Sequence, residues 1–130
     1  MTPTDCAFCR RVAEGPFVLE RPLVVAFADA FPVAQGHTLV IPRRHEGSLF
    51  DLSSAEYSAA WSAVADVRRV LDDVHHPDGF TVGVNVGAAA GQTAGHAHIH
   101  VIPRKNGDVA DPRGGVRWVL PDQAPYWRKP

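Results

Sequence analysis

Histidine occupies every second position in the segment GHAHIH at residues 95–100. Successive side chains of a β-strand point to opposite faces of its sheet, so His96, His98 and His100 would share one face. The residues between them are apolar and would pack on a core from the other face. This alternation predicts a strand over residues 96–102 whose histidine face borders a cleft or solvent. The alternative is a polar strand face on which the histidines are incidental.

Apolar runs bounded by breakers predict the remaining elements. Ser53 and Glu56 have the spacing of a capping box, and apolar residues then recur at three- to four-residue steps, so we expect one long helix that Pro77 and Gly79 end. The predicted strands cover residues 17–20, 24–29, 37–42, 79–86 and 96–102. Strands, one long helix and further strands indicate an α+β fold with an antiparallel sheet.

Length and charge narrow the functional classes. The 130 residues, 45% of them hydrophobic, fit a single domain over 1–130 that ends in a proline- and glycine-rich tail at 105–130. A net charge of −1 argues against binding of duplex nucleic acid but leaves a small nucleotide open. We find neither a signal-peptide pattern nor about 20 consecutive apolar residues, so we expect a cytoplasmic protein without membrane contact.

A metal site is indicated by the pair Cys6-x-x-Cys9, which supplies two soft ligands on one turn. His45 follows a predicted strand and His96 opens the histidine series, so these two would complete a tetrahedral zinc site. On a straight strand His96 and His100 would lie about 13 Å apart, too far to share one ion. The other histidines are therefore expected to do something else. Redox chemistry at the cysteines, or two ordinary core cysteines, are the alternatives.

The glycine-rich segment at residues 87–95 leads directly into the histidine strand. Glycines at 87, 91 and 95 permit backbone conformations that aim N–H groups at an anion. Gln92 and Thr93 add side-chain donors, and Asn85 precedes the segment. A phosphate held here would lie within reach of an imidazole, although a plain connection is the alternative.

The segment GQTAGHAHIHVIPR at 91–104 resembles the signature of the histidine triad (HIT) nucleotide-binding hydrolases and transferases. The similarity continues through Asn85, GHTLVIPRRH at 36–45 and Asp29 to CAFC at 6–9, so it covers roughly residues 6–104. Ala97 is smaller than the apolar residue of many relatives. The Cys-x-x-Cys form resembles the zinc-carrying bacterial branch, which is similar in metal ligation to the galactose-1-phosphate uridylyltransferases.

The resemblance implies a HIT-like fold and a covalent mechanism. His98 would attack the α-phosphorus of a nucleotide while its second ring nitrogen is tied to a backbone carbonyl. His100, Gln92 and Thr93 would hold the phosphoryl oxygens as charge shifts. The other implied nucleotide-binding residues are Phe27 near the base, Asp29 on the ribose, Asn85 and Gly91, with His37 behind the triad.

By the same resemblance, Cys6, Cys9, His45 and His96 would hold a structural zinc ion, and the protein would form a homodimer. Purine nucleotides such as AMP derivatives would be the substrates. Phosphoramidates, dinucleoside polyphosphates and nucleotide sugars all remain open as leaving-group classes. Two rival functions also remain: a nucleotide-sensing or partner-binding module with little turnover, and a hydrolase whose zinc activates water.

Overall fold

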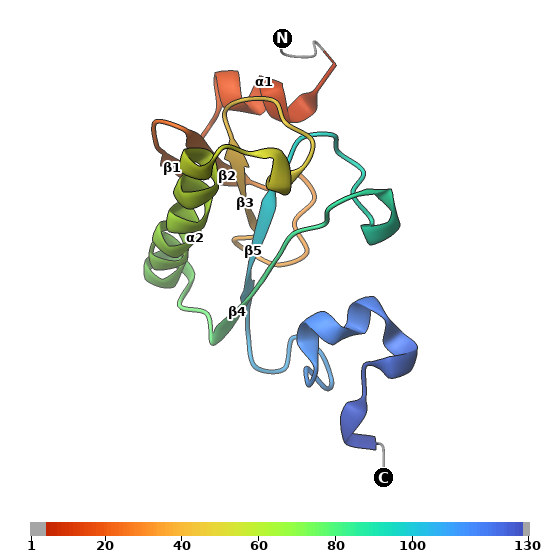
Figure 1. Ribbon diagram of the computed structural model, residues 1–130. Coiled ribbons are helices and arrows are strands. Elements are labelled where there is room, and N and C mark those ends of the chain that lie inside the picture. The colour runs from red at the N-terminus through yellow and green to blue at the C-terminus, as the bar shows by residue number, and fades with distance from the viewer. Residues whose placement is uncertain (1–4, 129–130) are drawn as a thin grey trace.

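A single antiparallel sheet of five strands, in the order β1-β2-β3-β5-β4, forms the centre of the computed structural model, which describes residues 5–128 (Figure 1). The predicted α+β class with an antiparallel sheet is confirmed. The strands are β1 (Leu19–Glu20), β2 (Val24–Ala28), β3 (Thr38–Pro42), β4 (Gly79–Gly83) and β5 (Ile99–Arg104).

Two α-helices cover opposite faces of the sheet. The long helix α2 (Ser54–His75) packs on Val24, Ala26 and Val40, together with the apolar residues of β5. The short helix α1 (Ala7–Glu14) packs on the other face through Phe8 and Val12. Figure 1 shows α2 beside the strands and α1 across the end of the sheet. None of the helices among residues 5–128 is long and apolar enough to span a bilayer.

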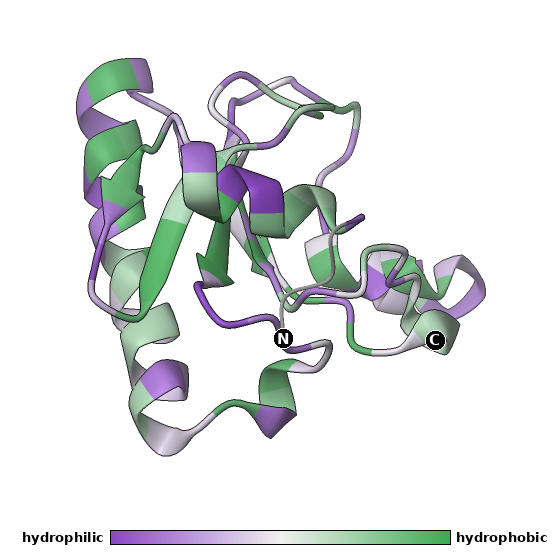
Figure 2. Ribbon diagram, turned by 90° about the horizontal axis from the view of Figure 1, so that it is seen from above, coloured by the Kyte–Doolittle hydropathy of each residue, from purple (hydrophilic) through white to green (hydrophobic). Residues whose placement is uncertain are grey.

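The long helix begins at the predicted capping box. The Ser53 hydroxyl accepts a hydrogen bond from the Glu56 amide, and the Glu56 carboxylate accepts one from the Ser53 amide. The helix ends at His75 because His76 adopts the left-handed conformation of a C-cap. The buried apolar residues of α2, among them Ala60, Val67 and Leu71, pack on the strands. Figure 2 shows the hydropathy of each residue along the ribbon, with apolar residues in green.

Two strands, β5 and β4, differ most from the sequence-based predictions. Strand β5 begins at Ile99, so His96 and His98 lie in the irregular segment before it, and it continues through Pro103 to Arg104. Pro103 is tolerated because β3 does not extend alongside it: the pairing of β3 with β5 reaches no further along β5 than Val101, which is opposite Thr38. Strand β4 stops at Gly83 rather than 86.

Helix α1 and the folded tail were not predicted. Cys6 caps α1 by accepting a hydrogen bond from the Cys9 amide, a role more usual for serine or aspartate. The C-terminal tail (residues 105–128) turns through short 3₁₀ helices and packs its Trp118 and Trp127 rings edge-on. Figure 1 shows it projecting beside the β4 end of the sheet. The remaining short 3₁₀ helices are η1 (Leu49–Asp51) and η2 (Ala88–Ala90).

Candidate functional site

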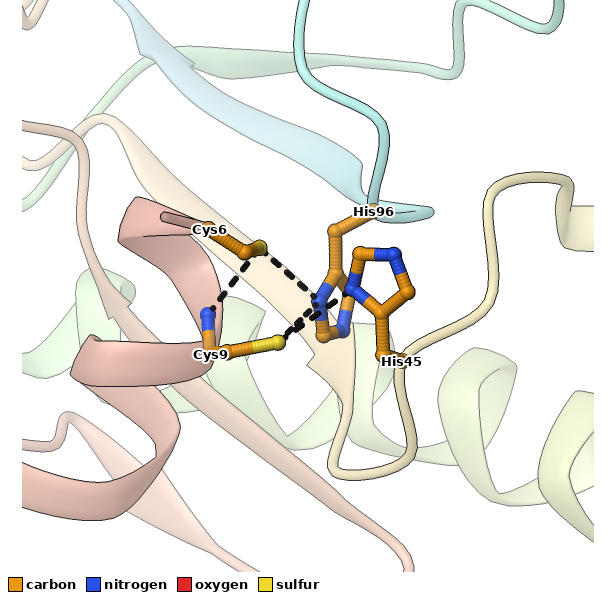
Figure 3. A group of neighbouring side chains, drawn as sticks. All are labelled: Cys6, Cys9, His45 and His96. Carbon is orange, nitrogen blue, oxygen red and sulfur yellow. Dashed lines mark hydrogen bonds between the residues drawn. The ribbon is translucent and has the colours of Figure 1, made fainter. Parts of the chain in front are cut away.

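Four potential metal ligands converge where α1 meets the end of the sheet. Cys6 and Cys9 come from the start of α1, His45 follows β3, and His96 precedes β5 (Figure 3). One ligand atom from each lies within 4.8 Å of the others. The Cys9 sulfur lies 3.2 Å from His45 Nδ1 and 3.5 Å from His96 Nδ1. Two thiols and two imidazoles form a donor set that suits tetrahedral zinc.

The backbone prepares His96 for ligation. Its Nε2 lies 2.8 Å from the carbonyl oxygen of Pro42, so Nε2 carries the proton and Nδ1 offers its lone pair to the cluster. Burial is the main cause that lowers the pKa of His96, which favours the neutral ring that a metal needs. Burial, followed by Cys6, raises the pKa of the Cys9 thiol to about 11, so without a cation this sulfur keeps its proton.

His98 is held in one tautomer. Its Nδ1 lies 2.8 Å from the carbonyl oxygen of His96, and a carbonyl only accepts, so Nδ1 carries the hydrogen. The other nitrogen, Nε2, then keeps a free lone pair. The side chain is only 7% exposed and lines a cleft. Phe8 meets the His98 ring edge-on with centroids 5.1 Å apart and restricts its rotation. This is the arrangement expected of a positioned nucleophile.

His100 is joined to a second network. His37 Nε2 lies 2.9 Å from His100 Nδ1 and 3.4 Å from a carboxylate oxygen of Asp29. The Val33 amide donates to His37 Nδ1 at 3.2 Å, so the proton of His37 resides on Nε2. Donation from this Nε2–H to His100 Nδ1 leaves the hydrogen of His100 on its own Nε2. Burial lowers the pKa of both His37 and His100, so both are neutral donors at pH 7.

A cleft of about 660 Å³ connects these groups. It lies on the α1 side of the sheet and is large enough for a nucleotide. Of the predicted residues, it is lined by Phe27, Asp29, His37, Asn85, Gly91, Thr93, His98 and His100. The structure thus gathers most of the predicted nucleotide-binding residues around one space.

Gln92 is the exception. Its amide nitrogen donates to the carbonyl oxygens of Gly47 and Ala94 at 2.7 and 3.0 Å, and its amide oxygen accepts from the Gly87 amide. Two of these contacts lie within the glycine-rich loop, and the third ties the loop to Gly47. Gln92 does not line the cleft. In this arrangement the Gln92 amide is engaged by backbone groups, and its contact with a phosphoryl oxygen stays a prediction. Gln92 shapes the loop.

Phe27 lines the cleft from a buried position. Its ring is 1% exposed, because the Arg11 guanidinium lies over it at 4.2 Å and Phe8 packs edge-on at 5.9 Å. The ring thus supports the cleft wall rather than offering a free stacking face. Sequence reasoning missed Phe8 and Arg11 because it missed α1. The apolar pattern at Phe8, Cys9 and Val12 was the available indication.

Comparison with known proteins places the chain in a family. The HIT domain profile matches residues 10–107 of the 130. The chain belongs to the HIT domain family. The predicted resemblance to the histidine triad proteins is therefore confirmed, and the matched range includes the whole sheet, α2 and all three triad histidines.

Several relatives of this HIT chain carry enzyme names. It is 37% identical over 89 residues to bis(5'-nucleosyl)-tetraphosphatase [asymmetrical] of Schizosaccharomyces pombe, covering 68% of this chain and 49% of the relative. It is 38% identical over 97 residues to AP-4-A phosphorylase of Mycobacterium tuberculosis, covering 74% and 50%. Adenylylsulfatase HINT3 of Arabidopsis thaliana is 36% identical over 107 residues, covering 80% and 54%. The HIT chain spans about half the length of these relatives.

Solved structures agree with the fold. A HIT family protein from Bacillus anthracis superposes with a TM-score of 0.73 at 36% identity, covering 80% of this chain and 76% of that one. A Zn-bound histidine triad family protein from Mycobacterium smegmatis superposes with a TM-score of 0.74 at 33% identity, covering 82% and 80%. The sheet and helices of the HIT chain therefore follow those of its relatives.

Proposed function

We propose that this HIT protein is a nucleotide hydrolase or nucleotidyltransferase that works through a covalent nucleotidyl-His98 intermediate. The observation that carries the proposal is the 2.8 Å contact between His98 Nδ1 and the His96 carbonyl oxygen, which frees Nε2 at the cleft. Relatives named as a tetraphosphatase, a phosphorylase and an adenylylsulfatase support a nucleotide substrate.

In the proposed first step, the Nε2 lone pair of His98 attacks the α-phosphorus of the nucleotide. A P–N bond to His98 forms, and the bond from phosphorus to the leaving group breaks, with its electron pair going to the leaving group. In the second step water attacks the same phosphorus and gives up a proton to solvent or to the departed leaving group, while the P–N bond breaks with its electron pair returning to Nε2. These events yield a nucleoside monophosphate and restore the neutral ring. The His96 carbonyl stabilises the positive ring while it lasts.

The remaining cleft residues would position the substrate. His100 Nε2–H and Thr93 would donate to the phosphoryl oxygens, with backbone amides near Gly91 in support. Asp29 would accept from the ribose hydroxyls, and Asn85 would bind nearby. Gln92 would act through the loop that it holds. The wall formed by Phe27 would adjoin the base.

The leaving group would be a phosphoramidate amine or the distal part of a dinucleoside polyphosphate. Both classes present an α-phosphate to His98, and two of the named relatives act on the second class by their names. A purine nucleotide such as an AMP derivative is the proposed substrate.

Zinc is the cofactor that the cluster of Cys6, Cys9, His45 and His96 fits. Bound zinc would take all four donors and cross-link the N-terminal segment to the sheet. Its role would be structural, because a closed Cys₂His₂ set leaves no position for a substrate or water. The Zn-bound relative from Mycobacterium smegmatis supports this assignment. We place the protein in the cytoplasm, where reducing conditions keep both cysteines as thiols.

The proposal is tested by replacing the nucleophile. His98→Asn should reduce turnover of adenosine phosphoramidate and diadenosine tetraphosphate by on the order of 10³-fold or more while AMP still binds, since only the covalent step is lost. His76→Asn is the matched control, because His76 is exposed in a left-handed conformation that asparagine tolerates. A near-native rate for His98→Asn would contradict the proposal.

The same assay separates the rivals. A sensing module would bind AMP and leave every substrate intact in the wild-type protein. A zinc hydrolase would turn over substrate without any nucleotide adduct on the peptide that contains His98. Mass spectrometry after rapid neutral quenching should detect that adduct if the covalent route operates.

A further inference from the structure

Where Phe27 forms the wall of the cleft, a cation covers the aromatic ring. The guanidinium carbon of Arg11 lies 4.2 Å from the centre of the Phe27 ring. Phe8 closes another side of that ring, and Phe27 is almost fully buried. A nucleobase entering the cleft therefore meets the Arg11 side chain, which lines it, before it can reach Phe27.

The guanidinium of Arg11 has no hydrogen-bonding or ion-pair partner among residues 5–128. Its Nε is buried without a hydrogen bond, and no carboxylate of the described residues forms an ion pair with it. Arg44 and Arg104, in contrast, form ion pairs with Glu56 and Asp108, respectively. A partly buried cation without an acceptor is costly, and a ligand that brings acceptors would relieve that cost.

The position of Arg11 relative to the triad matches the length of a nucleoside. Phe27, Leu39 and His100 are paired neighbours across β2, β3 and β5 and so share one face of the sheet. At about 4.8 Å per strand, Phe27 lies roughly 10 Å from His100. Asp29 lies two residues beyond Phe27 on the same chain. With phosphorus at His98 and ribose at Asp29, as in the proposed function on which this inference rests, the base reaches Arg11.

We propose that Arg11 reads the edge of the base and makes the cleft prefer guanine over adenine. Guanine offers two adjacent acceptors, O6 and N7, that match the paired donors of a guanidinium. Adenine replaces O6 with an amino group, which is a donor, and a guanidinium has no acceptor to offer it. The preference thus follows from donor and acceptor chemistry at a residue outside the histidine motif.

Glu14 is the competing influence. It lies one turn beyond Arg11 on α1 and also lines the cleft. Its carboxylate could accept from the adenine amino group or from the donors of guanine. Glu14 is exposed, so a base must displace water from its carboxylate, whereas the half-buried Arg11 side chain has less water to lose. The guanidinium therefore has more to gain from a base.

The test is equilibrium binding of GMP, IMP and AMP to the full wild-type chain with zinc bound, by titration calorimetry. These monophosphates are not consumed, so binding is measured without turnover. GMP should bind on the order of tenfold more tightly than AMP. IMP should follow GMP, because it keeps O6 and N7 but lacks the 2-amino group.

Two variants assign the preference. Arg11→Leu should bring the affinities for GMP and AMP together, and Arg11→Lys should do so in part, because it keeps the charge but loses the planar fork. Arg68→Leu, on the exposed side of α2 across the sheet, makes the same charge change and should leave the ratio unaltered. Circular dichroism and zinc content verify the fold of each variant.

Equal affinities in the wild type, or a preference that persists in Arg11→Leu, would overturn the inference. A preference for AMP that Glu14→Gln removes would assign the base contact to Glu14 instead, and would overturn it as well. If none of the three monophosphates binds to the folded wild-type chain, the proposed nucleotide function itself is wrong. The two failures are thus distinguishable.

Discussion

Ring tautomers, set by single backbone contacts, divide the labour among the histidines. The Pro42 carbonyl leaves Nδ1 of His96 free for the proposed metal, and the His96 carbonyl leaves Nε2 of His98 free for the proposed attack on phosphorus. The sequence spacing predicted that only one triad histidine would join the cysteines. It could not predict which nitrogen each ring would present, because that depends on carbonyls such as Pro42 that are distant in sequence.

Cys6 permits a test of the metal site at this scale. Cys6→Ser keeps an N-cap acceptor for α1, since serine is a good N-cap, but it removes a thiolate ligand. Zinc per chain should fall well below one equivalent and the melting temperature should drop by several degrees. Elemental analysis and thermal unfolding measure both. Unchanged zinc content would remove Cys6 from the site.

At the scale of elements, α2 was predictable and α1 was not. The capping box of Ser53 and Glu56 predicts the start of α2, and the three- to four-residue spacing of its apolar residues identifies the buried side. Helix α1 has eight residues and a cysteine cap, so it lacks the usual start pattern. The sequence also misplaced the start of β5, because His96 and His98 continue the sequence alternation of the strand but precede its paired residues.

Packing of α2 can be tested with two valines of one helix. Val67 is fully buried in the core, whereas Val74 is 64% exposed. Val67→Ala should lower the free energy of unfolding by about 2 kcal/mol, through lost burial and the cavity left behind. Val74→Ala should change it little, and urea denaturation measures both. Equal effects would show that α2 does not pack as described.

The cap of α2 should give the fold a pH dependence. Hydrogen bonds from Arg44, and then the Ser53 amide, lower the pKa of Glu56 from 4.5 to about 2. A carboxyl whose pKa is lower in the folded state stabilises the fold above its unfolded pKa and loses that effect as the pH falls.

The difference in the free energy of unfolding between wild type and Glu56→Gln should therefore be largest above about pH 4.5 and shrink as the pH falls toward 2. Denaturation at a series of pH values measures it. A difference that stays constant over this range would contradict the assigned role of Glu56.

At the scale of the whole molecule, β4 is an edge strand that pairs only with β5 in the described sheet. The neighbouring tail exposes apolar side chains, among them Val116, Val119 and Leu120. An open edge beside exposed apolar residues favours association, in line with the homodimer expected for this family. The sequence predicted neither which strand forms the edge nor how the tail folds beside it, because both depend on tertiary contacts.

The homodimer is a prediction that sedimentation equilibrium can check. The wild-type chain should sediment at twice its chain mass, and Val119→Asp should shift the protein toward monomer, because a charge would be buried in the interface. Val74→Asp, on the exposed side of α2, is the control and should remain dimeric. A wild-type chain that is monomeric at all concentrations would contradict the prediction.

His96 serves two parts of the molecule at once. Its imidazole belongs to the cysteine cluster at the N-terminal end, and its carbonyl oxygen holds the ring of His98. Loosening of the cysteine cluster would thus be transmitted through one peptide unit to His98 Nε2, the nitrogen proposed to attack phosphorus. A metal ion bound at the cysteine cluster, which would not contact the substrate, would consequently still affect the rate of turnover.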